Sequence, residues 1–306
     1  MANALDLVSS RNWLITAEGL ETLMTVAQRH GDVEALETRL GRKLDNTRHV
    51  TVRDGVAVIP VTGPIFRYAN LFTEVSGAVS TQMLATDIQT ALDDPAIRAI
   101  VLDADSPGGE ATGINELSDL IYNARSQKRI VTYVSGMAAS AMYWIGSAAG
   151  EIVVDDTAQL GSVGVVMTLA MAAQRDGAKT FEIVSSNAPN KRPSPETESG
   201  RAQLQARVDE LASVFLDKVS RNRSIPRDQV NDRLRQGGIA TGAIAVEAGM
   251  ADRLGSLESL IAELAGTSTS ASNSQRRLNM TTVRTTAEFR AALSRGVDPK
   301  TIVVVK

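Results

Sequence analysis

Residues 99–109 read Ala-Ile-Val-Leu-Asp-Ala-Asp-Ser-Pro-Gly-Gly, which is an apolar run followed by polar residues, a proline and two glycines. An apolar run of this length, closed by proline and glycine, predicts a buried strand that ends in a tight turn. The paired glycines, Gly108 and Gly109, let the backbone approach a ligand closely and aim N–H groups at a negative oxygen. The stretch therefore predicts one strand of an α/β sheet, with a binding edge at its carboxyl end.

The same alternation of strand and helix continues on both sides of this stretch. Strands that alternate with helices form a parallel sheet with covering helices. The fold class is therefore α/β with repeated βαβ units. We predict further strands at residues 55–65, 129–136, 151–156 and 179–186, and helices at residues 79–96, 114–127 and 139–149.

A proline-rich loop and a long helix follow the last of these strands. Residues 187–200 hold three prolines and show no apolar periodicity, which indicates a loop. Residues 201–223 predict an amphipathic helix whose apolar stripe covers the sheet or a neighbouring subunit. The stripe consists of Leu204, Val208, Leu211, Val214 and Phe215.

Changes in composition along the chain indicate its domain organisation. The apolar residues before residue 50 recur at helical spacing, which indicates a helical segment. From residue 267, a polar run rich in serine and threonine indicates a flexible linker. We expect the last residues to be loosely held or to fold only against a partner. The predicted parts are a helical N-terminal extension (1–50), the α/β domain (51–265), a flexible linker (266–275) and a C-terminal tail (276–306).

The composition of the 306-residue chain excludes several classes of function. The chain has no cysteine, which excludes a disulfide framework, a thiolate nucleophile and Cys-ligated metal, and it has no histidine motif for zinc. A net charge of −3 provides no basic face for nucleic acid. The first residues lack the pattern of a signal peptide, and no apolar stretch approaches the length of a membrane span. We therefore expect no metal or cofactor, no nucleic-acid partner, no membrane span and a cytoplasmic location.

Two histidines and seven lysines limit the general bases that a serine nucleophile could use. His30 and His49 belong to the N-terminal extension, so a histidine base requires this segment to fold back onto the sheet. A lysine base must be neutral; ordinary lysine has a pKa of about 10.4, which burial lowers. Lys191 stands alone in the proline-rich loop, whereas turns, a charged helix face or the terminal segments account for the other lysines.

Ser140 is the candidate nucleophile, since it lies among small residues at a predicted junction of strand and helix. The backbone turns sharply there, and the start of the helix offers free N–H groups to a developing oxyanion. The alternative is a structural role, because serine is a preferred N-cap residue. The segment Gly161-Ser162-Val163-Gly164 follows the next strand, so it is expected at the same sheet edge as Ser140 and the glycine pair.

These segments resemble the peptidase family of bacterial signal peptide peptidase A and, within it, the phage head-maturation proteases that process scaffold during capsid assembly. The resemblance covers about residues 50–262 and implies a crotonase/ClpP-like fold. It rests on four motifs in order: Asp-Ser-Pro-Gly-Gly at 105–109, Ala-Ala-Ser-Ala-Met-Tyr around Ser140, Gly-Ser-Val-Gly-Val at 161–165, and Ser-Ser-Asn-Ala-Pro-Asn-Lys-Arg-Pro around Lys191.

The resemblance implies a Ser/Lys dyad, with Ser140 as nucleophile and Lys191 as general base. The N–H groups of Gly109 and Ala141 would form the oxyanion hole, with Gly108 in support. Ser162 would hold the lysine amine. Because relatives of this fold assemble into rings, the resemblance also implies a homo-oligomer.

Two features favour the phage branch of the family. Ala141-Met142 stands where the membrane-associated members commonly have Gly-Gly, and residues 13–20 carry a Trp-x-Ile-Thr-x-Glu-x-Leu start. The resemblance then implies a capsid maturation protease that cleaves scaffold protein and itself. Its partners would be capsid or portal proteins, in the host cytoplasm or inside an assembling prohead.

Three alternatives stay open from the sequence. One is a soluble protease like signal peptide peptidase that degrades peptides, and another is a non-catalytic assembly protein on the same fold. A crotonase-type acyl-CoA enzyme would share the fold, but the sequence shows no acid/base carboxylate pair for its chemistry.

Overall fold

The structure is a computed structural model. Most of three predicted parts lies outside the described residues: the N-terminal extension, the linker (all but residue 266) and the tail. By their contacts, the residues divide into two compact units, Met1–Leu257 and Glu258–Lys306. The described residues are 12–29, 49–69, 78–169, 183–266, 281–283 and 302–304.

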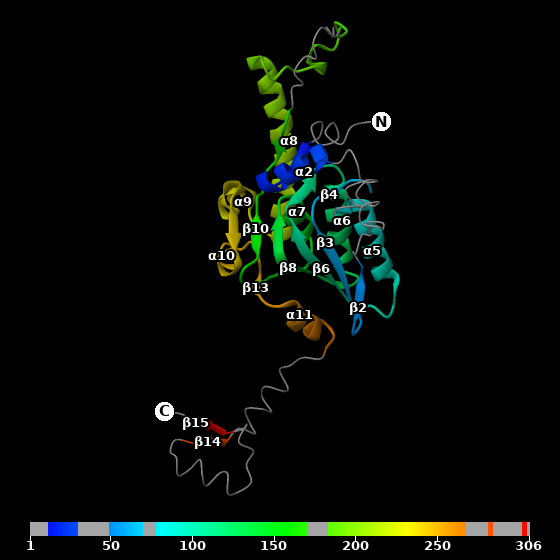
Figure 1. Ribbon diagram of the computed structural model, residues 1–306, viewed down its shortest axis with the longest axis vertical. Coiled ribbons are helices and arrows are strands. Elements are labelled where there is room, and N and C mark those ends of the chain that lie inside the picture. Colours follow the sequence, from blue (N-terminus) through cyan, green and yellow to red (C-terminus); the bar gives the residue numbers. More distant parts are fainter. Residues whose placement is uncertain are drawn as a thin grey trace. The chain divides into compact units, whose positions relative to one another are not determined.

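The larger unit is built around a mostly parallel sheet, in the order β12-β10-β8-β6-β3-β2 (Figure 1). Strands β3, β6, β8 and β10 are parallel neighbours, and β9, which also pairs with β13, joins β8 in parallel. Strands β2 and β12 pair antiparallel with β3 and β10. The predicted α/β class is thus confirmed. The bounds are β2 Thr51–Arg53, β3 Val56–Thr62, β6 Ala99–Ser106, β8 Arg129–Ala139, β9 Glu151–Val154, β10 Gln159–Gly161, β12 Ile239–Thr241 and β13 Arg253–Leu254.

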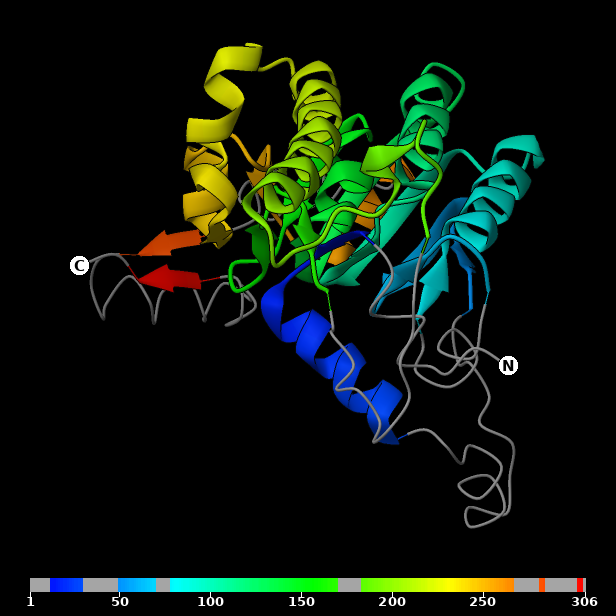
Figure 2. The same cartoon turned by 90° about the horizontal axis from the view of Figure 1, so that it is seen from above.

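Helices α5, α6 and α8 lie on one face of this sheet, together with α7, which packs on α6 and α8 (Figure 2). Ser80 begins α5 by accepting a hydrogen bond from the Met83 N–H at 3.1 Å, a normal N-cap. No described helix is long and apolar enough to cross a membrane. The bounds are α5 Thr81–Asp93, α6 Ile114–Ala124, α7 Ala141–Ser147, α8 Glu198–Arg223, α9 Arg227–Arg233 and α10 Gly242–Glu247.

The described part of the N-terminal extension begins with a strand that its helical periodicity did not predict. Strand β1 (Asn12–Ile15) pairs antiparallel with β7 (Gly108–Glu110) and β11 (Val166–Met167). Helix α2 (Ala17–Arg29) follows, and its Leu20 is buried. Four residues are too few to show a period, and both strands that pair with β1 lie more than ninety residues away in the chain. The smaller sheet that results has the order β11-β1-β7-β4-β5, with β4 at Ile65–Phe66 and β5 at Val79–Ser80.

The apolar stripe predicted along α8 is buried only toward the end of the helix. Phe215 is fully buried and stacks on Trp144 of α7, with ring centroids 4.7 Å apart. Earlier in the helix, Leu204 and Val208 are half-buried, and Val214 is 41% exposed. The first half of α8 therefore carries apolar side chains that its own chain covers only in part.

One further prediction concerns a segment after β10. The strand predicted at residues 179–186 lies outside the described residues up to 182, and residues 183–186 form no strand. In the smaller unit, β14 (Thr281–Val283) pairs in parallel with β15 (Ile302–Val304). Helix α11 (Leu257–Leu264) precedes them.

Candidate catalytic site

Ser140 occupies a sharp turn between β8 and α7. Its φ of 53° and ψ of −114° are unusual for a residue with a side chain, and backbone strain of this kind gathers at functional sites. The residue precedes α7 at the N-cap position, yet its side chain makes no cap hydrogen bond. Instead, its Oγ lies 3.5 Å from the Gly164 carbonyl oxygen. The helix-cap alternative therefore accounts for the position of Ser140 but not for the direction of its hydroxyl.

The segment after β10 lies directly beside Ser140. The Ser140 N–H donates to the Gly161 carbonyl at 2.8 Å. Ser162, half-buried, has a φ of 52°, and its N–H donates to the Gly238 carbonyl at 3.0 Å. A second strained residue with a hydroxyl side chain thus follows the strand next to β8.

The turn with two glycines lies on the other side of β8. Ser106 is in register with Ala138, which brings residues 107–109 to the end of β8 that leads into Ser140. Strand β7 is clamped between β1 and β4, so that a Cβ on Gly109 would lie 2.0 Å from the Ile65 carbonyl oxygen. The Gly108 N–H donates to the Ser106 hydroxyl at 3.2 Å. Only glycine fits at position 109, as the close approach of three strands requires.

Helix α7, which begins at Ala141, is anchored firmly behind the serine. Ala141 is fully buried, and the Tyr143 hydroxyl donates to the Met250 carbonyl at 3.1 Å. Burial raises the pKa of Tyr143 to about 12. Tyr143 is therefore a neutral structural donor and not a proton acceptor for Ser140.

The described residues do not join Lys191 to Ser140. Lys191 ends a short 3₁₀ turn, η1 (Pro189–Lys191), and its side chain is exposed beside a hollow of about 400 Å³. Among the described residues, no hydrogen bond links its ammonium to the serine. In Figure 1, the segment that leads into α8 stands apart from the start of α7. The structure therefore assembles Ser140, the glycine turn and residues 161–164, but leaves Lys191 outside this group.

His49, the histidine that the structure describes, offers no base near Ser140. His49 is exposed just before β2, and strands β3 and β6 lie between β2 and the strand that carries Ser140. His30 lies outside the described residues. No group of His, Asp and Glu side chains that could hold a metal ion is found in the described ranges.

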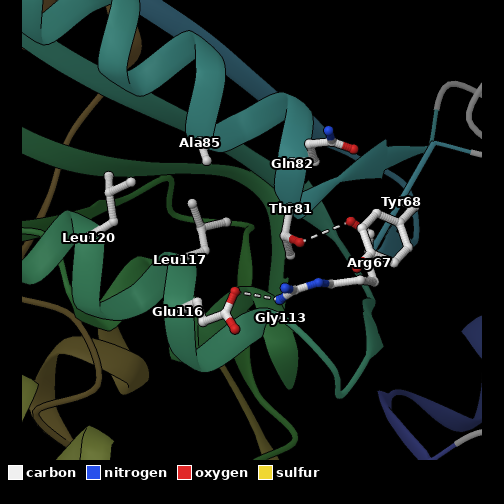
Figure 3. A pocket seen from close by; sticks show the side chains of 9 residues that line it. All are labelled: Arg67, Tyr68, Thr81, Gln82, Ala85, Gly113, Glu116, Leu117 and Leu120. Atoms are coloured by element: carbon white, nitrogen blue, oxygen red, sulfur yellow. Dashed lines mark hydrogen bonds and ion pairs between the residues drawn. The ribbon is translucent and has the colours of Figure 1, made fainter.

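The hollow between the first turns of α5 and α6 is a weaker candidate for a site (Figure 3). Arg67 points into it, but its guanidinium forms an ion pair with Glu116 at 2.6 Å. The Thr81 hydroxyl donates to the Arg67 carbonyl at 3.1 Å. Because its cation is already paired, this hollow offers little to attract a charged ligand.

Sequence reasoning missed a contribution of the N-terminal segment to the region around the glycine turn. The Thr16 N–H donates to the Pro107 carbonyl at 3.0 Å, and the Thr16 hydroxyl accepts from the Gly19 N–H at 3.1 Å. The start of α2 is thereby tied to the residue before the glycine pair. The Trp-x-Ile-Thr-x-Glu-x-Leu pattern at 13–20 covers this contact, although nothing in that pattern identifies its partner.

Comparisons with known proteins show one family match and several similar proteins. Residues 123–269 match the model described as Peptidase family S49. Capsid assembly protease C of Escherichia phage lambda is 31% identical over 212 residues, which cover 68% of this chain and 48% of that protein. Head-tail preconnector protein GP5 of Enterobacteria phage P21 is 29% identical over 220 residues, covering 66% of this chain and 41% of that protein.

A cellular relative is somewhat less similar. Protease 4 of Haemophilus influenzae is 26% identical over 226 residues, which cover 71% of this chain and 35% of that protein. The chain spans less than half the length of each of these three relatives.

Proposed function

We propose, from the match of residues 123–269 to peptidase family S49, that this chain is a serine endopeptidase of phage capsid maturation. Its substrates would be scaffold protein and its own termini, and its partners capsid or portal proteins. It would act in the host cytoplasm or inside an assembling prohead. The capsid assembly protease and the head-tail preconnector protein among its relatives support this reading over a peptide-degrading enzyme.

The observation that carries the proposal is the conformation of Ser140. Strain at one serine, a hydroxyl that does not cap its helix, and a glycine turn beside it are the features of an activated nucleophile. A non-catalytic assembly protein would have no use for this strain. In such a protein, an alanine in an unstrained turn could replace Ser140 without loss.

The proposed reaction is acyl transfer. The Ser140 Oγ attacks the substrate carbonyl carbon while the neutral Lys191 amine accepts the hydroxyl proton. The N–H groups of Gly109 and Ala141 donate to the oxyanion that forms on the carbonyl oxygen. The lysine returns the proton to the leaving amine, and water then hydrolyses the acyl-enzyme. Ser162 would orient the lysine amine by a hydrogen bond.

The test of this function is incubation of the chain with candidate scaffold protein, followed by mass mapping of the fragments. We expect a few defined cuts in scaffold, because a maturation protease acts at specific sites. A membrane-derived signal peptide that is degraded while scaffold stays intact would favour the peptide-degrading alternative.

The proposal includes a homo-oligomeric ring in which Lys191 of one chain serves Ser140 of the next. Two observations support it: no described hydrogen bond joins the two residues within one chain, and in the first half of α8, which follows Lys191, Leu204 and Val208 are only half-buried. A head-to-tail contact that closes into a ring would repeat such a shared site at every interface.

A mixture of two inactive variants tests this arrangement. Ser140→Ala and Lys191→Ala, unfolded and refolded together, should regain about one quarter of the wild-type activity, because a random ring pairs an intact serine with an intact lysine at about one interface in four. Each variant refolded alone is the control. If the mixture stays as inactive as its components, the dyad lies within one chain.

A further inference from the structure

A hollow of about 620 Å³ lies where the parallel strands end beneath the start of α2. Asp105 of β6, Met137 of β8 and Gln159 of β10 form its base, one from each of three strands that adjoin in the sheet. Glu18 and Thr22, from the first turns of α2, close it from the other side. We call it the acidic pocket.

The acidic pocket adjoins the candidate catalytic site through two of its walls. Pro107, which also lines it, directly precedes the glycine pair. Met137 precedes Ser140 by three residues in one chain segment, which corresponds to about 10 Å along a strand. A side chain in the pocket would therefore belong to a substrate residue close to the bond that Ser140 attacks.

The chemical character of the pocket combines apolar walls with negative charge. Pro107, Met137 and Ile239 supply apolar surface, while Glu18 and Asp105 are exposed carboxylates. No residue that lines the pocket is cationic, and no ion pair joins either carboxylate to a cation in the described part of the chain. A ligand with an apolar stem and a positive end matches both features.

The position of Asp105 is fixed by its neighbours. A Cβ on Gly136 would lie 2.3 Å from Asp105 Oδ1, so the carboxylate lies directly against the β8 backbone. Asp103, two residues earlier on the same strand, has a raised pKa, chiefly because it is buried, with a smaller increase from the charge of Asp105. Asp105 thus lies beside a second carboxyl group, and a bound cation would offset the repulsion between the two groups.

We propose that the acidic pocket binds the side chain of a substrate lysine or arginine within three residues of the cleaved bond, with Glu18 and Asp105 as its specificity-determining residues. The inference rests on the proposed peptidase function and gives it a substrate class. The methylene groups of the basic side chain would contact Pro107 and Met137, and its charged end would reach the carboxylates.

Peptides that differ only in charge test the proposal. A peptide around a mapped scaffold cut is prepared with arginine, its neutral isostere citrulline, or glutamate at each position within three residues of the cut. At one position, kcat/KM for arginine should exceed that for citrulline by about 10- to 100-fold, which is the effect of one or two charge-assisted hydrogen bonds. Glutamate should be the poorest of the three.

Variants of the two carboxylates should remove this preference. Glu18→Gln and Asp105→Asn should each bring the ratio of arginine to citrulline closer to one, and Glu18→Arg should favour glutamate. Glu21→Arg is the matched control, since Glu21 is exposed on the same helix but does not line the pocket. It should leave the ratio unchanged.

The outcomes separate this inference from the proposed function. If the peptides are cut at equal rates, the acidic pocket is not a basic subsite, although the peptidase function stands. If scaffold is not cut at all, the peptidase function fails, and binding of scaffold-derived peptides with arginine, citrulline or glutamate to Ser140→Ala decides the pocket. Preferential binding of the arginine peptide then upholds the inference, and equal binding overturns it.

Discussion

Ser140→Ala is expected to lower kcat on scaffold by about 10⁴-fold or more, because removal of a nucleophile eliminates the covalent route. The fold should persist, since the Ser140 side chain is buried among small residues and does not cap α7. Initial rates measured by fragment analysis, with the melting temperature recorded alongside, provide the check. Labelling by a fluorophosphonate probe should disappear in the same variant.

Ser135→Ala is the matched control for this change. Ser135 lies on the same strand, five residues before Ser140, and its hydroxyl donates to the Ala104 carbonyl at 3.3 Å. Its removal should leave both turnover and labelling near the wild-type level. Persistent cleavage by purified Ser140→Ala would refute the assignment of the nucleophile.

Lys191→Arg should be nearly as inactive as Lys191→Ala. A guanidinium stays protonated at any working pH, so it cannot accept the serine proton whatever its position. We expect a loss of at least about 10³-fold in kcat/KM, comparable to the loss of a general base. The pH profile of the wild-type enzyme should also lack an inflection near 6.5, which an imidazole base would produce.

Lys218→Arg controls for the exchange of one cation for another. The Lys218 ammonium forms an ion pair with Asp119 at 2.8 Å, which arginine can preserve. This variant should keep near-normal turnover on the same peptide. If Lys191→Arg is equally active, the residue supplies only charge or packing, and His30 becomes the histidine that is left as a candidate for the base.

The parts of the structure that the sequence predicts well are those with strong local patterns. The apolar run at 99–106 forms β6, and the helix predicted at 79–96 forms α5, because apolar periodicity acts within a few residues. The turn at Pro107 appears where predicted. At these positions, the neighbouring residues alone were enough to predict the secondary structure.

Other features depend on contacts between distant residues, which a single sequence does not display. The four residues of β1 gain their structure from β7 and β11, and the acidic pocket combines Glu18 with Asp105, 87 positions later in the chain.

The pairing of β1 with β7 also bears on how this protein can be shortened. A chain that starts at residue 51, where the predicted α/β domain begins, would keep the glycine turn but lose the strand that covers one side of it. The backbone N–H and C=O groups of β7 would then form an open edge, and such edges recruit strands from other molecules. By covering this edge, the residues Asn12–Ile15 thus prevent aggregation through β7, beside the glycine turn of the proposed catalytic site.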